Sequence, residues 1–95
     1  MKRRDRDYKV RIAITGITKG ACSQGFKVGD TWLIEKNVTP PNFCMNAFCQ
    51  AVYPSLRTMR YGGSHRWDED PDVTTVACPD VHHQVIFELR RLPLE

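Results

Sequence analysis

The chain has 95 residues and a net charge of +3, and 41% of its residues are hydrophobic while 26% are charged. That length allows one domain, and that balance is ordinary for a globular protein and argues against disorder. No apolar run approaches the roughly 18 residues that a membrane-spanning helix needs, which excludes a membrane partner. The charged start has no apolar segment behind it, so we expect no signal peptide and a cytoplasmic location.

Positive charge is concentrated at the start of the chain. The basic residues there are Lys2, Arg3, Arg4, Arg6, Lys9 and Arg11. A charge run at a terminus is usually a solvated tail, and we favour that interpretation over an arm that binds nucleic acid. We therefore divide the chain into a basic tail (residues 1–7), one domain (residues 8–92) and a short C-terminal tail (residues 93–95).

Four segments have the composition of β-strands. Residues 8–15 alternate apolar with polar or small side chains, which predicts a half-buried strand. Residues 31–35 predict a second strand, preceded by a turn at Gly29-Asp30. Residues 73–78 and 84–92 predict a third and a fourth strand, and the short connection between them predicts an antiparallel hairpin.

Residues 42–63 are the only segment long and periodic enough for a substantial helix. Asn42 is a suitable N-cap, and Gly62-Gly63 supplies the left-handed residue that ends a helix. Pro54 lies in the middle, where it removes one hydrogen bond, so we predict a kinked or two-part helix. The residues at steps of three and four that predict its buried stripe are Cys44, Phe48, Val52, Ser55/Leu56 and Met59.

The element order β-β-α-β-β predicts an α+β fold. We expect a four-stranded antiparallel sheet with the helix on one face and the other face partly wet. The order of the strands within the sheet stays open.

Short motifs along residues 8–92 carry a resemblance to a known family. They are Cys22 with residues 25–30, Phe43-Cys44, Tyr53-Pro54, residues 60–63 with Trp67, Cys78-Pro79-Asp80, and residues 85–90. In this pattern the chain resembles a family of short bacterial and archaeal cytoplasmic proteins of uncharacterised function. Cys49 is not part of the pattern, and the resemblance implies no activity.

The cysteines are the main candidates for chemistry. Cys44 and Cys49 are five residues apart, about 140° around a regular helix, so they cannot chelate one ion. Cys22, Cys44 and Cys78 are the set that a metal or thiol site would use, although their spacing matches no zinc-finger signature. Three buried, purely structural cysteines are the alternative that we favour.

Cys44 is also a candidate reactive thiol by itself. With Asn42 as N-cap it would be the second residue of the helix, where free backbone N–H groups stabilise a thiolate. We therefore expect Cys44 to alkylate faster than Cys49.

The other polar residues predict no site. His82 and His83 are adjacent and point to opposite faces of a strand, and His65 is expected to be a solvated loop residue. The acidic residues Asp68, Glu69, Asp70 and Asp72 lack the spacing of a calcium loop. No known catalytic motif occurs, so the sequence leaves open whether the chain is an enzyme and which cofactor it would use.

The leading functional hypothesis from sequence is a small cytoplasmic domain with a cysteine-lined thiol or metal site at the helix N-terminus. One alternative is a nucleic-acid-binding module that uses the basic N-terminal arm, for which we expect no binding even at low salt. Another alternative is a plain protein-interaction domain with structural cysteines, in which a protein partner or a homo-oligomer is open.

Overall fold

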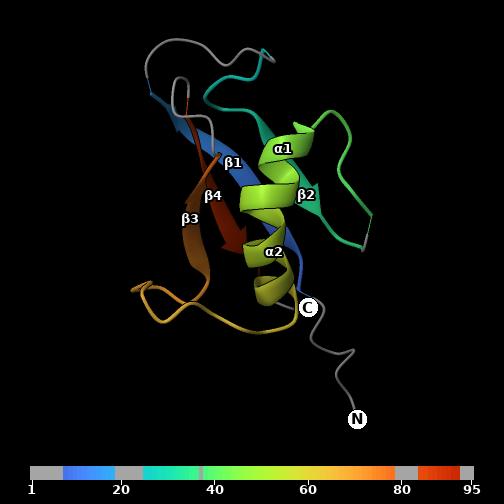
Figure 1. Ribbon diagram of the computed structural model, residues 1–95. Coiled ribbons are helices and arrows are strands. Elements are labelled where there is room, and N and C mark those ends of the chain that lie inside the picture. Colours follow the sequence, from blue (N-terminus) through green and yellow to red (C-terminus); the bar gives the residue numbers. More distant parts are fainter. Residues whose placement is uncertain (1–7, 19–24, 37, 79–83, 93–95) are drawn as a thin grey trace.

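A computed structural model describes residues 8–18, 25–36, 38–78 and 84–92. Four strands form one antiparallel sheet in the order β2-β1-β4-β3, and one continuous helical segment lies on a single face of it (Figure 1). The strands are β1 (Val10–Ile17), β2 (Thr31–Ile34), β3 (Val73–Ala77) and β4 (Val85–Arg91). The helical segment consists of α1 (Met45–Ala47), a π-helical turn η2 (Phe48–Val52) and α2 (Tyr53–Arg60). The predicted α+β fold is confirmed.

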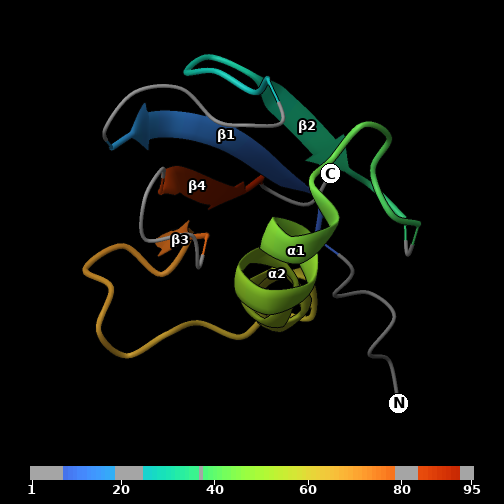
Figure 2. The same cartoon turned by 45° about the horizontal axis from the view of Figure 1, so that its top comes forward.

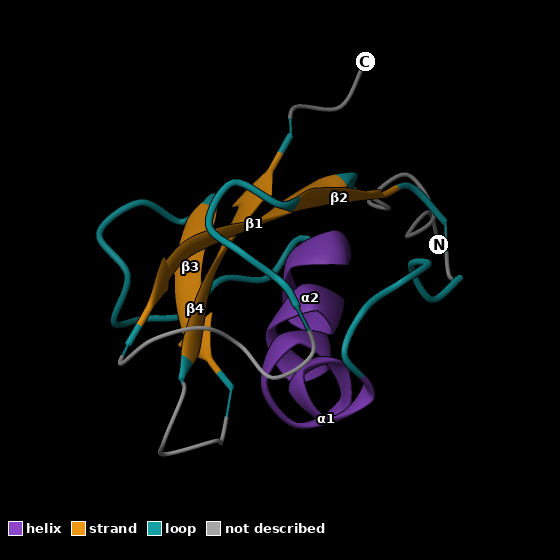
Figure 3. Ribbon diagram, turned by 90° about the horizontal axis from the view of Figure 1, so that it is seen from above, coloured by secondary structure: helices purple, strands orange, loops and turns teal. Residues whose placement is uncertain are grey.

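The alternation of buried and more exposed residues along the strands places the apolar side chains on one face of the sheet. In β1, Val10, Ile12 and Ile14 are buried, and in β4 the buried residues recur at every second position from Val85. These side chains share the face that the helical segment covers, which Figure 3 shows from above. The opposite face carries Arg11 and Thr75, which are both exposed, so that face is partly open to solvent, as predicted.

The strand boundaries differ slightly from the prediction for β1. Tyr8 was expected to open the strand, but its N–H donates to the carbonyl of Arg60 (2.8 Å) at the end of α2. At the other end β1 continues to Ile17, because a register shift between Ile14 and Gly16 keeps it paired with β4. The predicted hairpin is confirmed, since β3 pairs antiparallel with β4 from Val73↔Arg90 to Ala77↔Ile86.

Pro54 is accommodated by a π-helical turn rather than a sharp kink. The N–H of Tyr53 donates to the carbonyl of Phe48, five residues earlier, and α2 then runs with Pro54 in its first turn. A widened turn suits this position because proline has no N–H and its ring crowds the carbonyl four residues before it. Figure 2, which looks more nearly along the helix, shows α1 and α2 as one continuous column.

The π-helical turn also corrects the predicted buried stripe. Val52, Leu56 and Met59 are buried as expected, but the next buried residue toward the N-terminus is Ala47, five positions before Val52. Phe48 and Cys44 are only partly buried. In a π-helical turn a residue lies above the one five positions on, so the stripe shifts by one position.

The helix begins later than predicted and ends as predicted. Asn42 is not the N-cap: its φ is 53°, and the first helical residue is Met45 with Cys44 in the cap position. At the other end Gly62 has a φ of 90°, and the N–H of Gly63 donates to the carbonyl of Thr58 (2.9 Å).

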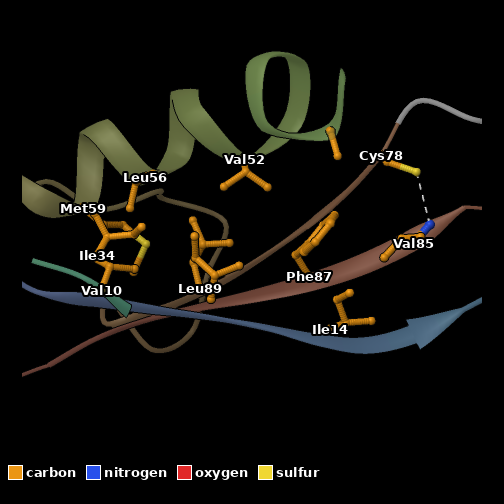
Figure 4. Close-up of a cluster of buried hydrophobic side chains, with 12 residues drawn as sticks. Val10, Ile14, Ile34, Val52, Leu56, Met59, Cys78, Val85, Phe87 and Leu89 are labelled. Atoms are coloured by element: carbon orange, nitrogen blue, oxygen red, sulfur yellow. Dashed lines mark hydrogen bonds between the residues drawn. The ribbon is translucent and has the colours of Figure 1, made fainter. Parts of the chain in front are cut away.

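The core is a single cluster between the helical segment and the sheet. Val52, Leu56 and Met59 of the helical segment face Val10, Phe87 and Leu89 of the sheet in Figure 4. Partly buried rings extend this cluster, with the ring centroids of Phe43 and Phe87 5.4 Å apart.

Two buried arginines cover the end of the core that lies beside the C-terminal end of α2. Arg60 donates to the carbonyls of Tyr8 (3.1 Å) and Glu35 (3.0 Å). Arg91 donates to Asp72 and to the carbonyls of Met59, Gly63 and Pro71 at 2.6–3.0 Å. Each guanidinium therefore ties the C-terminal end of α2 to the sheet.

Candidate functional site

A cleft of about 290 Å³ opens between α2 and the segment that follows β2. In Figure 1 α2 lies at the centre and the segment after β2 runs to its right. The residues that line the cleft are Ile34, Lys36, Val38, Thr39, Phe48, Tyr53, Leu56, Arg57, Arg60 and Tyr61. Ile34 and Leu56 are buried core residues, so the floor of the cleft is the edge of the core itself.

One side of the cleft is a ridge of three side chains, two on α2 and one from its C-cap residue, Tyr61. Tyr53, Arg57 and Tyr61 are spaced four residues apart, which places them along one line of the helix with a rise of about 6 Å between neighbours. This line lies off the buried stripe, and Tyr53 and Tyr61 are 47% and 45% exposed. The ridge therefore offers two rings and a guanidinium to a ligand in the cleft.

The charge of the lining is positive. Lys36 and Arg57 are exposed and lie on opposite walls, while Arg60 is buried and engaged with the carbonyls of Tyr8 and Glu35. None of the described residues that line the cleft is acidic. A group with negative charge would meet two exposed cations here and no repelling carboxylate among the described lining residues.

Phe48 reaches this cleft because of the π-helical turn. On a regular helix it would lie on the buried stripe above Val52, whereas the structure buries Ala47 and leaves Phe48 partly exposed in the cleft wall. Its ring also contacts that of Tyr53, with 5.8 Å between centroids.

The cysteines lie in different environments. Cys44 is partly buried against the core, Cys49 is exposed on the π-helical turn, and Cys78 is buried. The Cys78 sulfur accepts a hydrogen bond from the N–H of Val85 (3.2 Å), the dashed line in Figure 4. This hydrogen bond joins the residue after β3 to the first residue of β4.

The predicted three-cysteine site stays a prediction. Cys22 lies outside the described residues, as do His82 and His83. Within the part of the chain that the structure describes, no three His, Cys, Asp or Glu side chains come together to hold a metal ion. The argument for Cys44 as a helix-start thiol is weakened, because Asn42 does not cap the helix.

The loop after α2 differs from expectation at His65. Its side chain is only 11% exposed, packs against the Trp67 ring and lies 3.5 Å from Asp68, so it is not the solvated histidine that we predicted. Glu69, Asp70 and Asp72 are exposed, as expected for a solvated acidic turn.

The sequence contained a signal for part of the cleft that we did not use. The pattern Tyr-x3-Arg-x3-Tyr at residues 53–61 is visible in the chain and lies off the apolar stripe. Among the other aromatic residues, Phe87 is buried and Tyr8 and Trp32 are partly buried. Lys36 has no such signal, because only the path of the chain after β2 brings it opposite Arg57.

No protein-family model, curated protein or solved structure matches the chain. None of the helices among the described residues is long and apolar enough to cross a membrane.

Proposed function

We propose that the protein is a small binding domain that takes an anionic ligand with a planar ring in the cleft beside α2. The observation that carries this proposal is the pairing of Lys36 and Arg57 on opposite walls, beside the rings of Phe48, Tyr53 and Tyr61. A volume of about 290 Å³ suits one ring and one charged group, and is near the lower limit of ligand pockets, roughly 300 Å³.

The chemistry of the lining favours binding over catalysis. The described residues of the cleft include no carboxylate, histidine or cysteine, which are the usual general acids, bases and nucleophiles. Arginine and lysine bind anions, and tyrosine and phenylalanine stack on planar rings. The proposal therefore replaces the cysteine-lined site as the leading hypothesis, while the thiol or metal hypothesis for Cys22, Cys44 and Cys78 stays open.

Three small probes separate the contributions of ring and charge. Phenyl phosphate carries both, inorganic phosphate carries only the charge, and benzyl alcohol carries only the ring. We expect phenyl phosphate to bind more tightly than either of the others, with amide chemical-shift changes in the NMR spectrum at Val38, Thr39 and Arg57.

Charge-removing variants locate the site. Lys36→Gln and Arg57→Gln should each weaken phenyl phosphate binding about tenfold, because each removes a charge-assisted contact. Arg66→Gln is the matched control, since Arg66 is exposed in the loop after α2 and does not line the cleft. Equal affinities for phenyl phosphate and inorganic phosphate, or equal losses in Arg66→Gln and Arg57→Gln, would refute the proposal.

A further inference from the structure

The edge of the sheet at β3 has open backbone groups. Cys78 N–H donates to the Val85 carbonyl (2.9 Å) and Arg91 N–H donates to the Asp72 carbonyl (2.7 Å). Bonding directions alternate along an antiparallel strand, so the even-numbered residues of β3 bond to β4 and Val73, Thr75 and Ala77 face outward. The N–H of Val73 donates to the carbonyl of Asp70 (3.1 Å). Among the described residues, the N–H groups of Thr75 and Ala77 have no hydrogen-bond acceptor.

The opposite edge of the sheet is better protected. β2 has only four residues, and the chain after it folds back so that Trp32 Nε1 donates to the carbonyl of Pro41 (3.1 Å). The carbonyl of Glu35, just beyond β2, already accepts a hydrogen bond from Arg60. Figure 1 shows β3 at the other side of the sheet, with no helix or strand of the described residues beyond it.

β3 also lacks the features that usually protect an edge strand. Its sequence, VTTVA, contains no charged residue and no proline, and four of its five residues are β-branched. The structure records no bulge in its pairing with β4. A strand of this kind is suited to accept another strand.

We infer that β3 pairs antiparallel with β3 of a second copy of this chain, around a two-fold axis at Thr75. In this register Thr75 lies opposite its own counterpart and Val73 lies opposite Ala77. The Thr75 groups exchange two hydrogen bonds, and each Ala77 N–H donates to the Val73 carbonyl of the other copy. These bonds satisfy the outward N–H groups without disturbing the bond of Val73 to Asp70.

Charge supports the antiparallel arrangement. The acidic residues Asp68, Glu69, Asp70 and Asp72 all precede β3, so a two-fold axis at Thr75 sends the two acidic loops to opposite ends of the paired strands. A parallel pair would place them side by side, where like charges repel. No charged residue lies opposite another within the paired strands.

The loop before β3 adds surface to this contact. In Figures 1 and 2 it reaches out past β3 on the open side of the sheet. With the strands paired, each loop lies beside the end of the partner's β3. The loop contains Trp67, which is 72% exposed. Because strand pairing alone buries little area, we expect a dissociation constant on the order of micromolar.

Oligomeric state and hydrogen exchange test this inference. In analytical ultracentrifugation of the full chain we expect a monomer–dimer equilibrium. Amide exchange at Thr75 and Ala77 should slow as the concentration rises, because only the dimer bonds these groups. A chain that stays monomeric at hundreds of micromolar, or exchange at these amides that ignores concentration, would overturn the inference.

A matched pair of variants locates the interface. Thr75→Lys places two cations opposite each other at the axis and should raise the dissociation constant at least tenfold. Thr31→Lys is the control, because Thr31 is an exposed threonine on the other edge strand, and it should leave the dimer unchanged. Equal effects of the two variants would exclude the β3 edge.

A cross-link keeps the test independent of that substitution. Opposed residues of a hydrogen-bonded antiparallel pair lie about 5.5 Å apart at Cα, a separation that suits a disulfide. Mild oxidation should therefore link Thr75→Cys into covalent dimers and should not link Thr31→Cys. Failure of Thr75→Cys to link while the protein is dimeric would refute the register.

Discussion

At the scale of single residues, the two buried arginines differ from the exposed cations in what they contact. Arg91 is 9% exposed and most of its acceptors are backbone carbonyls, whereas its carboxylate partner Asp72 has a side chain that is 57% exposed. Its Cζ also lies 4.9 Å from the centroid of the Tyr8 ring. Arg91 therefore acts as a cap for the end of α2, contributed by a strand.

Arg91→Leu should lower the free energy of unfolding by about 3 kcal/mol, because it removes the guanidinium donors to the carbonyls of Met59, Gly63 and Pro71. Arg91→Lys should recover only part of this loss, since a single ammonium cannot reach the same set of acceptors. Arg90→Leu is the matched control on the opposite face and should cost less than about 1 kcal/mol, because Arg90 has one partly exposed pair with Glu88. Urea denaturation measures all three.

The cysteines should alkylate in the order of their exposure. Among the three described cysteines we expect Cys49 to react first, Cys44 more slowly and Cys78 last, because Cys49 is exposed and Cys78 is buried with its sulfur bonded to the N–H of Val85. This order reverses the one that the sequence predicted for Cys44 and Cys49, which depended on Asn42 as a cap. Mass-spectrometric mapping of iodoacetamide labelling over time decides between the two orders, and Cys44 labelling ahead of Cys49 would restore the original hypothesis.

At the scale of elements, the periodicity of apolar residues and the turn residues were enough to predict four strands, one helix that is kinked or in two parts, and the β3–β4 hairpin. The start of the helix was not predictable, because Asn42 has the side chain of a cap but adopts a left-handed backbone conformation. The sequence also failed to predict that Ala47 takes the place of Phe48 in the buried stripe, because helical periodicity assumes regular turns. The cleft was missed because its second wall is a segment without periodicity.

The π-helical turn behaves as one extra residue inserted between Ala47 and Val52. Deleting Gln50, which is exposed, should restore a spacing of four between these two buried residues. By itself the deletion brings Pro54 into a regular helix, which costs about 3 kcal/mol. Combined with Pro54→Ala it should be much less harmful, and a double-mutant cycle of urea denaturation measures this coupling. Additive losses would show that Pro54 does not cause the wide turn.

At the scale of the whole molecule, β4 connects the two halves of the sheet. It pairs with β1 on one side and β3 on the other, and β1–β2 is the only other pairing among the described strands. A chain that ends before Val85 should therefore show no cooperative thermal transition in circular dichroism. Removal of residues 1–7 is the control: it lowers the net charge from +3 to +1 and should leave the transition unchanged, because the first described anchor is Tyr8.

The central place of β4 has a consequence for synthesis. During translation β1 and β2 emerge first, and the helical segment and β3 follow before their shared neighbour in the sheet exists. Until β4 inserts, the apolar faces of β1 and of the helical segment have no sheet to close them. Such long-range pairings are slow to form. The domain is therefore expected to complete its fold only after β4 has left the ribosome.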